Sequence, residues 1–335
     1  MISRVVKKKT VRSLQLSCWL ALVCILLHML AVPSKAAPSK TTPSKTTASI
    51  QPYITINFPS TEVGKYYLVK PGTLYTEDAR LSDYKPARGA VNIAANSQIA
   101  LKLSYYGSTN TSLLKAIPAQ AVRYLDLGQM EIGNAEFQDL LHFNELVSLD
   151  MGGTDVNDNG TVGLRNLTKL QHLDIGFCPI GLSTVEEISH LKELLRLTFS
   201  SNTLGDKAGP MLAKLKKLQV LVLSTTVMTD SCIKDLSTLN DLQELNLARN
   251  NVTDKCIDHL LRLKHLRRLN LADTKVTVSG LMRLNQLPAL THLLLRKNQL
   301  SAEQLKQLQR RLPKVILEEG TKLKDFDPDL FKPVH

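Results

Sequence analysis

Apolar positions recur along most of the chain with a period of 24 residues. Each unit opens with the same alternating phrase, as in LQELNL from Leu242, and no unit slips out of step. The first residues of the units are Val122, Leu146, Leu170, Leu194, Leu218, Leu242, Leu266 and Leu290. Self-similarity at a period of roughly 20 to 50 residues is typical of stacked repeats, each with one strand and a return segment. The pattern predicts eight equal units that share one core.

Within a unit, the apolar residues at positions 1, 4 and 6 predict a short strand with alternate side chains turned inward. A Thr-Asp step at positions 12 and 13, as at Thr253 and Asp254, places a hydroxyl and a carboxylate where a helix can begin. Apolar residues then recur at helical spacing. Position 19 is apolar in every unit, which predicts a continuous core ladder of Leu140, Leu164, Ile188, Leu212, Leu236, Leu260, Leu284 and Leu308.

Residues 53–121 lack this period. Alternation of apolar and polar residues predicts half-buried strands at Ile54–Phe58, Ala90–Ile93 and Gln98–Leu103. We expect this segment to be a small β-rich cap, because an open solenoid end would expose its leucines. The repeats should run over residues 122–317, with a final partial strand at Val315–Leu317. Residues 318–335 are the expected C-terminal cap or tail.

The N-terminus has the pattern of an export signal over residues 1–36. A basic stretch, Arg4–Arg12, precedes an apolar run, Leu14–Val32, and small residues follow at Ser34 and Ala36. Cleavage after Ala36 is the prediction. The alternative is an uncleaved signal anchor, because the run is long enough to span a bilayer.

Composition adds two points. Residues 37–52 repeat the unit PSKTT, which cannot bury a core and predicts a disordered linker. The formal charge is +12, but residues 1–36 carry six basic and no acidic side chains, so the remainder is +6. A mildly basic remainder does not suggest a nucleic-acid-binding protein.

The consensus LxxLxLxxN/T/CxΦ, with Φ apolar, resembles the leucine-rich repeat family over residues 122–317. Later units such as NNVTDKCIDHL are similar to its ribonuclease-inhibitor-like and exported bacterial subtype. The resemblance implies an α/β leucine-rich repeat solenoid, or horseshoe, with a concave parallel β-sheet and convex short helices. Early units depart from the consensus: Met130 and Cys178 stand at position 9, and the second unit has a Gly-Asn loop in place of a clean helix. We expect irregular bends there.

Positions 3, 5 and 7 of each unit should face the concave surface. Position 5 holds three aspartates on neighbouring strands about 4.8 Å apart, where repulsion raises at least one carboxyl pKa unless a positive charge lies nearby. Either a cationic partner or a metal ion relieves that repulsion, or the carboxylates are solvated. Basic residues gather in the last three units, so we expect an acidic and a basic end, with exposed aromatic residues as anchors. The candidate partner-binding residues are Tyr124, Asp126, Asp150, Asp174, Phe177, Arg196, Arg249, Arg268 and Arg296.

Catalytic and metal-binding motifs are few. Beyond the predicted export signal the cysteines are Cys178, Cys232 and Cys256, an odd set that favours free, buried thiols over disulfides. Asp155–Gly160 imitates a calcium loop, but Asn166 stands where a bidentate glutamate is needed. There is no constellation for nucleophilic catalysis and no phosphate-binding loop. We therefore expect no enzymatic activity, no cofactor and no metal ion.

These patterns favour a non-enzymatic, exported recognition module that binds a protein or a cell-envelope polymer through its concave face. Its expected location is periplasmic, cell-surface or secreted, with membrane association only through residues 14–32. No small-molecule substrate is expected. The alternative is an intracellular substrate-recognition subunit of the ubiquitin-ligase adaptor type, against which the apolar leader argues.

Overall fold

The computed structural model describes residues 53–69 and 83–318, which lie within one compact unit, Gln51–His335. The predicted export signal and linker, and all but the first residue of the predicted tail, lie outside the described residues. No helix among the described residues is long and apolar enough to cross a membrane.

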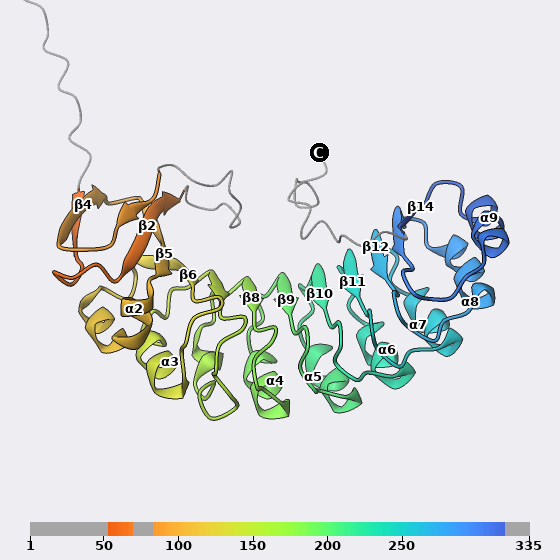
Figure 1. Ribbon diagram of the computed structural model, residues 1–335, viewed down its shortest axis with the longest axis horizontal. Coiled ribbons are helices and arrows are strands. Elements are labelled where there is room, and N and C mark those ends of the chain that lie inside the picture. The colour runs from red at the N-terminus through yellow and green to blue at the C-terminus, as the bar shows by residue number, and fades with distance from the viewer. Residues whose placement is uncertain (1–52, 70–82, 319–335) are drawn as a thin grey trace, which may run out of the picture. The chain divides into compact units, whose positions relative to one another are not determined.

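The eight repeats each contribute one strand to a single parallel sheet (Figure 1). Partners in neighbouring strands are 24 residues apart, as with Leu221 beside Leu245. The predicted register is therefore confirmed. The strands are β6 (Val122–Asp126), β7 (Ser148–Asp150), β8 (His172–Asp174), β9 (Arg196–Thr198), β10 (Val220–Val222), β11 (Glu244–Asn246), β12 (Arg268–Asn270) and β13 (His292–Leu294).

The sheet continues beyond the repeats at both ends. β14 (Ile316–Glu318) pairs in parallel with β13, at the predicted partial strand. At the other end β5 (Gln98–Leu103) pairs in parallel with β6, and β2 (Gly64–Val69) and β3 (Lys85–Pro86) extend the sheet in antiparallel fashion. β1 (Tyr53–Asn57) and β4 (Ala90–Ala94) form a separate antiparallel pair. Strand β2 was not among the strands expected from alternation, because Tyr66 and Tyr67 are both buried.

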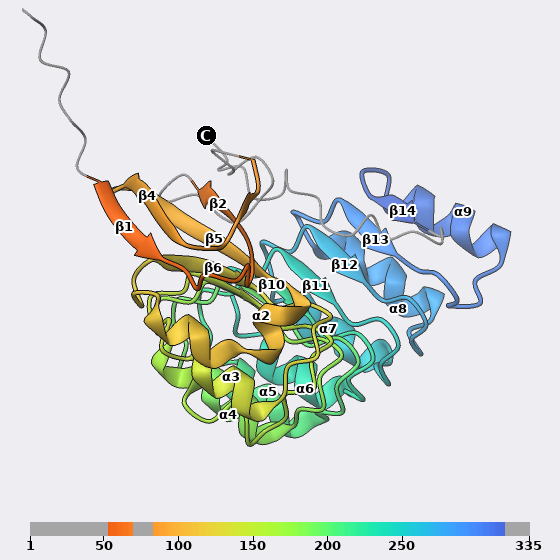
Figure 2. The same cartoon turned by 60° about the vertical axis from the view of Figure 1, so that its left-hand side comes forward.

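Short helices return the chain on the side of the sheet opposite its concave face (Figures 1 and 2). The second unit has only a 3-10 turn, as its Gly-Asn loop predicted. The helices of the cap are α2 (Tyr105–Thr109) and η2 (Thr111–Ala116); those of the repeats are α3 (Asn134–Leu140), η3 (Leu164–Asn166), α4 (Leu182–Ile188), η4 (Asp206–Ala208), α5 (Gly209–Leu212), α6 (Asp230–Leu236), η5 (Asp254–Cys256), α7 (Ile257–Leu260), α8 (Val278–Met282), η6 (Arg283–Gln286) and α9 (Ala302–Arg311).

One hydrophobic core runs between the strands and the helices. All eight residues at position 19 are buried in it, which confirms the predicted ladder. Cys178, Cys232 and Cys256 are buried and free, as expected. Burial raises the pKa of Cys256 to about 12 and that of Cys232 further still, so neither thiol ionises at neutral pH.

A ladder of buried side chains at position 9 joins successive bends. The amide of Asn250 donates to the carbonyl of Leu223 at 2.7 Å and to that of Leu247 at 3.0 Å, while its oxygen accepts from the backbone of Met228 at 2.9 Å. Cys178 occupies the same place and donates its thiol to the carbonyl of Met151 at 3.1 Å. The irregular bend expected at Cys178 is therefore absent.

The bend at Met130 is regular too. The residue before it, Gln129, has the same positive φ as position 8 of every other unit, including Phe177 before Cys178. The expectation of an irregular bend at Met130 was therefore wrong.

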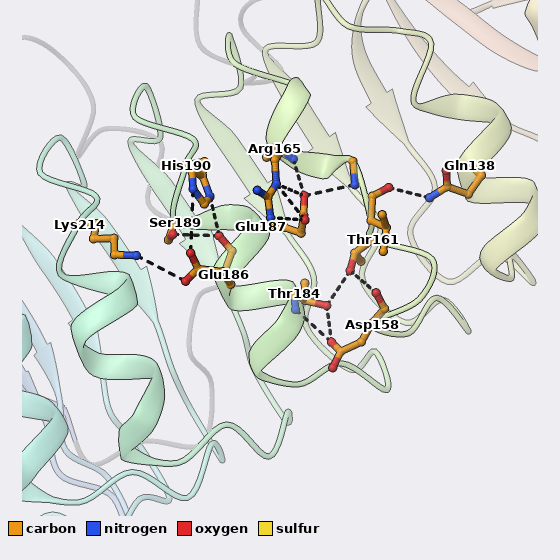
Figure 3. A network of polar contacts seen from close by, with 12 residues as sticks. Gln138, Asp158, Thr161, Arg165, Thr184, Glu186, Glu187, Ser189, His190 and Lys214 are labelled. Carbon is orange, nitrogen blue, oxygen red and sulfur yellow. Dashed lines mark hydrogen bonds and ion pairs between the residues drawn. The ribbon is translucent and has the colours of Figure 1, made fainter.

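Polar contacts hold the irregular second unit to its neighbours (Figure 3). Asp158 accepts from the backbone of Gly181 at 2.8 Å and from the hydroxyl of Thr184 at 2.5 Å, at the start of α4. Arg165 forms a forked ion pair with Glu187, with its closest approach at 2.6 Å. Asp158, which lies within the calcium-loop imitation, thus caps the start of α4.

Candidate binding trough

The concave face of the sheet forms an open trough, which we define by its floor and its rim. The floor is built by positions 5 and 7 of the repeats, because alternate residues of a strand face the same side. Small side chains at position 7 keep the floor low through seven units. The residues at position 7 are Gly128, Gly152, Gly176, Ser200, Ser224, Ala248, Ala272 and, in the last unit, Arg296.

The rim of the trough is built by position 8, which has a positive φ in every unit. The backbone N–H of this residue donates to the position 7 carbonyl of the next unit, as from Phe177 to Ser200 at 2.7 Å. The left-handed turn directs seven non-glycine side chains to the trough. They are Gln129, Phe177, Ser201, Thr225, Arg249, Asp273 and Lys297. Of this row, only Phe177 and Arg249 were among the candidate residues, because the residue types at position 8 share no common chemistry.

Aspartates crowd the acidic end of the trough. Asp126 forms an ion pair with Lys102 at 2.7 Å. Asp150 lies open to the trough, but the neighbouring strands displace much of its hydration. That burial, followed by the charges of Asp174 and Asp126, raises its pKa to about 6 against the opposing hydrogen bond from Gly152. Burial also raises the pKa of Asp174. The raised pKa expected for the stack is found, with burial rather than repulsion as its largest cause.

These aspartates also have a structural role, which the residue pattern does not predict. Asp150 accepts from the backbone N–H of Gly152 at 3.0 Å, and Asp174 accepts from Gly176 at 2.9 Å. Asn246 binds the N–H of Ala248 in the same way. Position 5 thus caps the end of the strand in the five units where it holds a carboxylate or an amide.

The middle of the trough carries charges that are paired with one another. Arg268 lies 3.9 Å from Glu244, and Arg249 lies 4.0 Å from Asp273. Burial lowers the pKa of Arg196. The charges of Glu244 and Asp174 oppose this shift.

The basic end is formed by Arg296 and Lys297, which follow β13 and are both exposed. Neither has an ion-pair partner among the described residues. Three further basic residues of this region, Arg262, Lys264 and Arg267, do not line the trough. They lie on the bend between helix and strand.

Eight of the nine candidate partner-binding residues line the trough, and Tyr124 does not. Its side chain is 2% exposed and packs with Tyr67, Val69 and Ala100, so the expectation of an exposed aromatic there was wrong. Phe177, the other expected aromatic, is 66% exposed.

Neither His172 nor the aspartate stack forms a metal site. Burial and the charge of Arg196 lower the pKa of His172 to about 4, so its imidazole is neutral at physiological pH. Among residues 53–69 and 83–318, no group of three His, Cys, Asp or Glu side chains could hold a metal ion.

A family model matches parts of the repeats. Residues 166–189, 238–255 and 262–284 match the family model described as Leucine Rich repeat. No curated protein sequence matches the chain.

Similar solved structures include internalin C2 of Listeria monocytogenes, with 27% identity over 59% of this chain and 80% of that chain and a TM-score of 0.45. A leucine-rich repeat protein of Leptospira interrogans has 21% identity over 63% of this chain and 57% of that chain, with a TM-score of 0.44. The ectodomain of the Arabidopsis receptor kinase HAESA, in complex with an extended IDA peptide hormone ligand, has 20% identity over 54% of this chain and 31% of that chain, with a TM-score of 0.42.

The 24-residue register is kept by every strand from β6 to β13, and three segments match the family model within these repeats. The chain is built of leucine-rich repeats over these segments and has the fold of a leucine-rich repeat solenoid.

Proposed function

We propose that the chain is a non-enzymatic recognition module that binds a protein partner in the trough. One observation carries the proposal: small side chains at position 7 leave one face of the sheet open across seven units, while the other face is fully packed. Leucine-rich repeat folds generally serve as protein-interaction scaffolds. A rigid sheet holds the side chains that would contact the partner, so little ordering entropy is lost on binding.

Position-specific cross-linking tests the site. A photo-reactive residue at Ser200, on the floor of the trough, should capture a partner in the organism's own extract. The same residue at Lys234, exposed on α6 on the outer side, is the matched control. Capture of a protein at Ser200 and not at Lys234 supports the proposal. Equal capture at both positions, capture only at Lys234, or capture of a polysaccharide instead of a protein would contradict it.

The proposal includes export, which is supported by the basic and apolar pattern of residues 1–36. Sequencing the N-terminus of the protein from cell fractions tests this part. A mature form starting at Ala37 in the exported fraction is the expected result. An intact form starting at Met1 in the cytosol would contradict export and favour the intracellular adaptor.

A further inference from the structure

Most charges that line the trough are already neutralised by a neighbour. Asp126 is paired with Lys102, Glu244 with Arg268, and Asp273 with Arg249. Arg196 interacts with the charges of Asp174 and Glu244. The remaining charges of the described part of the trough are in no ion pair. They are Asp150 with Asp174 at one end, and Arg296 with Lys297 at the other, where Glu318 on β14 also lines the trough.

The acidic end combines carboxylates with an exposed aromatic ring. Asp150 and Asp174 each use Oδ1 to cap their own strand. Asp174 also accepts a hydrogen bond from the side chain of Thr198, whereas Asp150 keeps its second oxygen for a ligand. Phe177, three residues after Asp174, presents its ring at the rim. A Lys or Arg side chain satisfies both groups, because its charge meets the carboxylates while its stem or guanidinium packs on the ring.

The basic end lies five strand steps from Asp174 and six from Asp150. At about 4.8 Å per step the two ends are about 24 to 29 Å apart. An extended peptide advances about 3.3 Å per residue, so it covers this distance in about seven to nine residues. The low floor between the ends leaves room for a backbone to lie across the strands.

We propose that the trough binds an extended segment of a partner protein, with a Lys or Arg side chain at Asp150, Asp174 and Phe177 and an acidic side chain about seven to nine residues away at Arg296 and Lys297. The inference rests on the proposed function and specifies its partner. Charge complementarity at the two ends, with neutral pairs between them, sets the register of the segment in the trough.

Selection from a displayed library of random dodecapeptides tests the charge pattern. On the wild-type chain, we expect enrichment of peptides with a basic residue seven to nine positions from an acidic one. Arg296→Glu with Lys297→Glu should shift the enrichment to peptides that are basic at both ends. It should also weaken the wild-type selected peptide about tenfold by fluorescence anisotropy, with a smaller loss in high salt.

Two matched variants complete the test. Lys234→Glu with Lys255→Glu makes the same change in net charge on the outer side, and its selected peptides should match those of the wild type. Asp150→Asn with Asp174→Asn keeps the strand-capping acceptors and should abolish only the enrichment of the basic residue.

Any of three outcomes would overturn the inference. The enriched peptides lack the charge spacing, the variant with Arg296→Glu and Lys297→Glu selects the same peptides as the wild type, or no peptide is selected. If Ser200 nonetheless cross-links a protein partner, the proposed function stands and only its charge pattern is wrong. If Ser200 captures no partner, both fall.

Discussion

Asp230 holds Thr253 of the next repeat with both carboxylate oxygens. Oδ1 accepts from the backbone N–H at 2.8 Å, and Oδ2 accepts from the hydroxyl at 2.7 Å. The pairs of Asp206 with Thr229 and Asp254 with Thr277 repeat the arrangement 24 residues away on either side. The Thr-Asp step therefore joins neighbouring repeats in addition to starting a helix.

Asp230→Ala should destabilise the fold by about 1 to 3 kcal/mol, because it leaves the half-buried N–H and hydroxyl of Thr253 without their acceptor. A double-mutant cycle with Thr253→Val, measured by urea unfolding, should give a coupling energy of at least about 0.5 kcal/mol. Additive effects of the two substitutions would show that the pair contributes nothing between repeats.

Asn250→Ala should cost about 3 kcal/mol or more, because the buried amide serves donors and acceptors in two successive bends. The neighbouring Asn251 is exposed, and Asn251→Ala is the control, with an expected change within about 0.5 kcal/mol. Similar unfolding free energies for the two variants would refute the role of the position 9 ladder.

Val227 is a β-branched residue with φ of 61°, held there by the contacts of Asn250 with the flanking residues Thr226 and Met228. Left-handed backbone costs a residue of this kind about 1 to 2 kcal/mol, which glycine avoids. Val162 is 61% exposed against 50% for Val227 and does not have a positive φ. Val227→Gly should therefore be more stable than Val162→Gly by about 1 to 2 kcal/mol in thermal unfolding. Equal effects would show that Val227 is not strained.

The stability of the fold should depend on pH through Asp150. Its folded pKa of about 6 lies above the ordinary value of 3.8, so the folded chain keeps a proton that the unfolded chain releases between these values. Stability therefore falls as pH rises through this window. Asp150→Asn keeps an acceptor for Gly152 and should raise the melting temperature at pH 7.5, with the gain lost at pH 4. Asp241→Asn, on an exposed turn, is the control. A pH-independent effect of Asp150→Asn would contradict the assignment.

The repeats could be predicted from the sequence because parallel pairing at a spacing of 24 residues puts each position into the same environment in every unit. Leu221 and Leu245 lie side by side for this reason, and the residues at position 19 share one core. The same logic placed on the trough the six lining candidates at positions 3, 5 and 7, which are Asp126, Asp150, Asp174, Arg196, Arg268 and Arg296.

The features that could not be predicted depend on contacts between residues far apart in the sequence. The left-handed turn at position 8 is set by a backbone hydrogen bond to the next repeat, so residues as different as Phe177 and Arg249 adopt it. Tyr124 has the same local pattern as other residues at position 3. It is buried because β2, more than fifty residues earlier, joins the sheet and contributes Tyr67 and Val69 to its surroundings.

The central claim is that the trough is the binding surface. Its most direct test measures the affinity of two variants for the free partner that the cross-linking identified. Ser224→Trp fills the floor of the trough, whereas Ser231→Trp adds the same side chain on the outer helix α6. With folding verified by circular dichroism, calorimetry should show at least about a tenfold loss for Ser224→Trp and wild-type affinity for Ser231→Trp. Wild-type affinity for Ser224→Trp, or a loss confined to Ser231→Trp, would contradict the account.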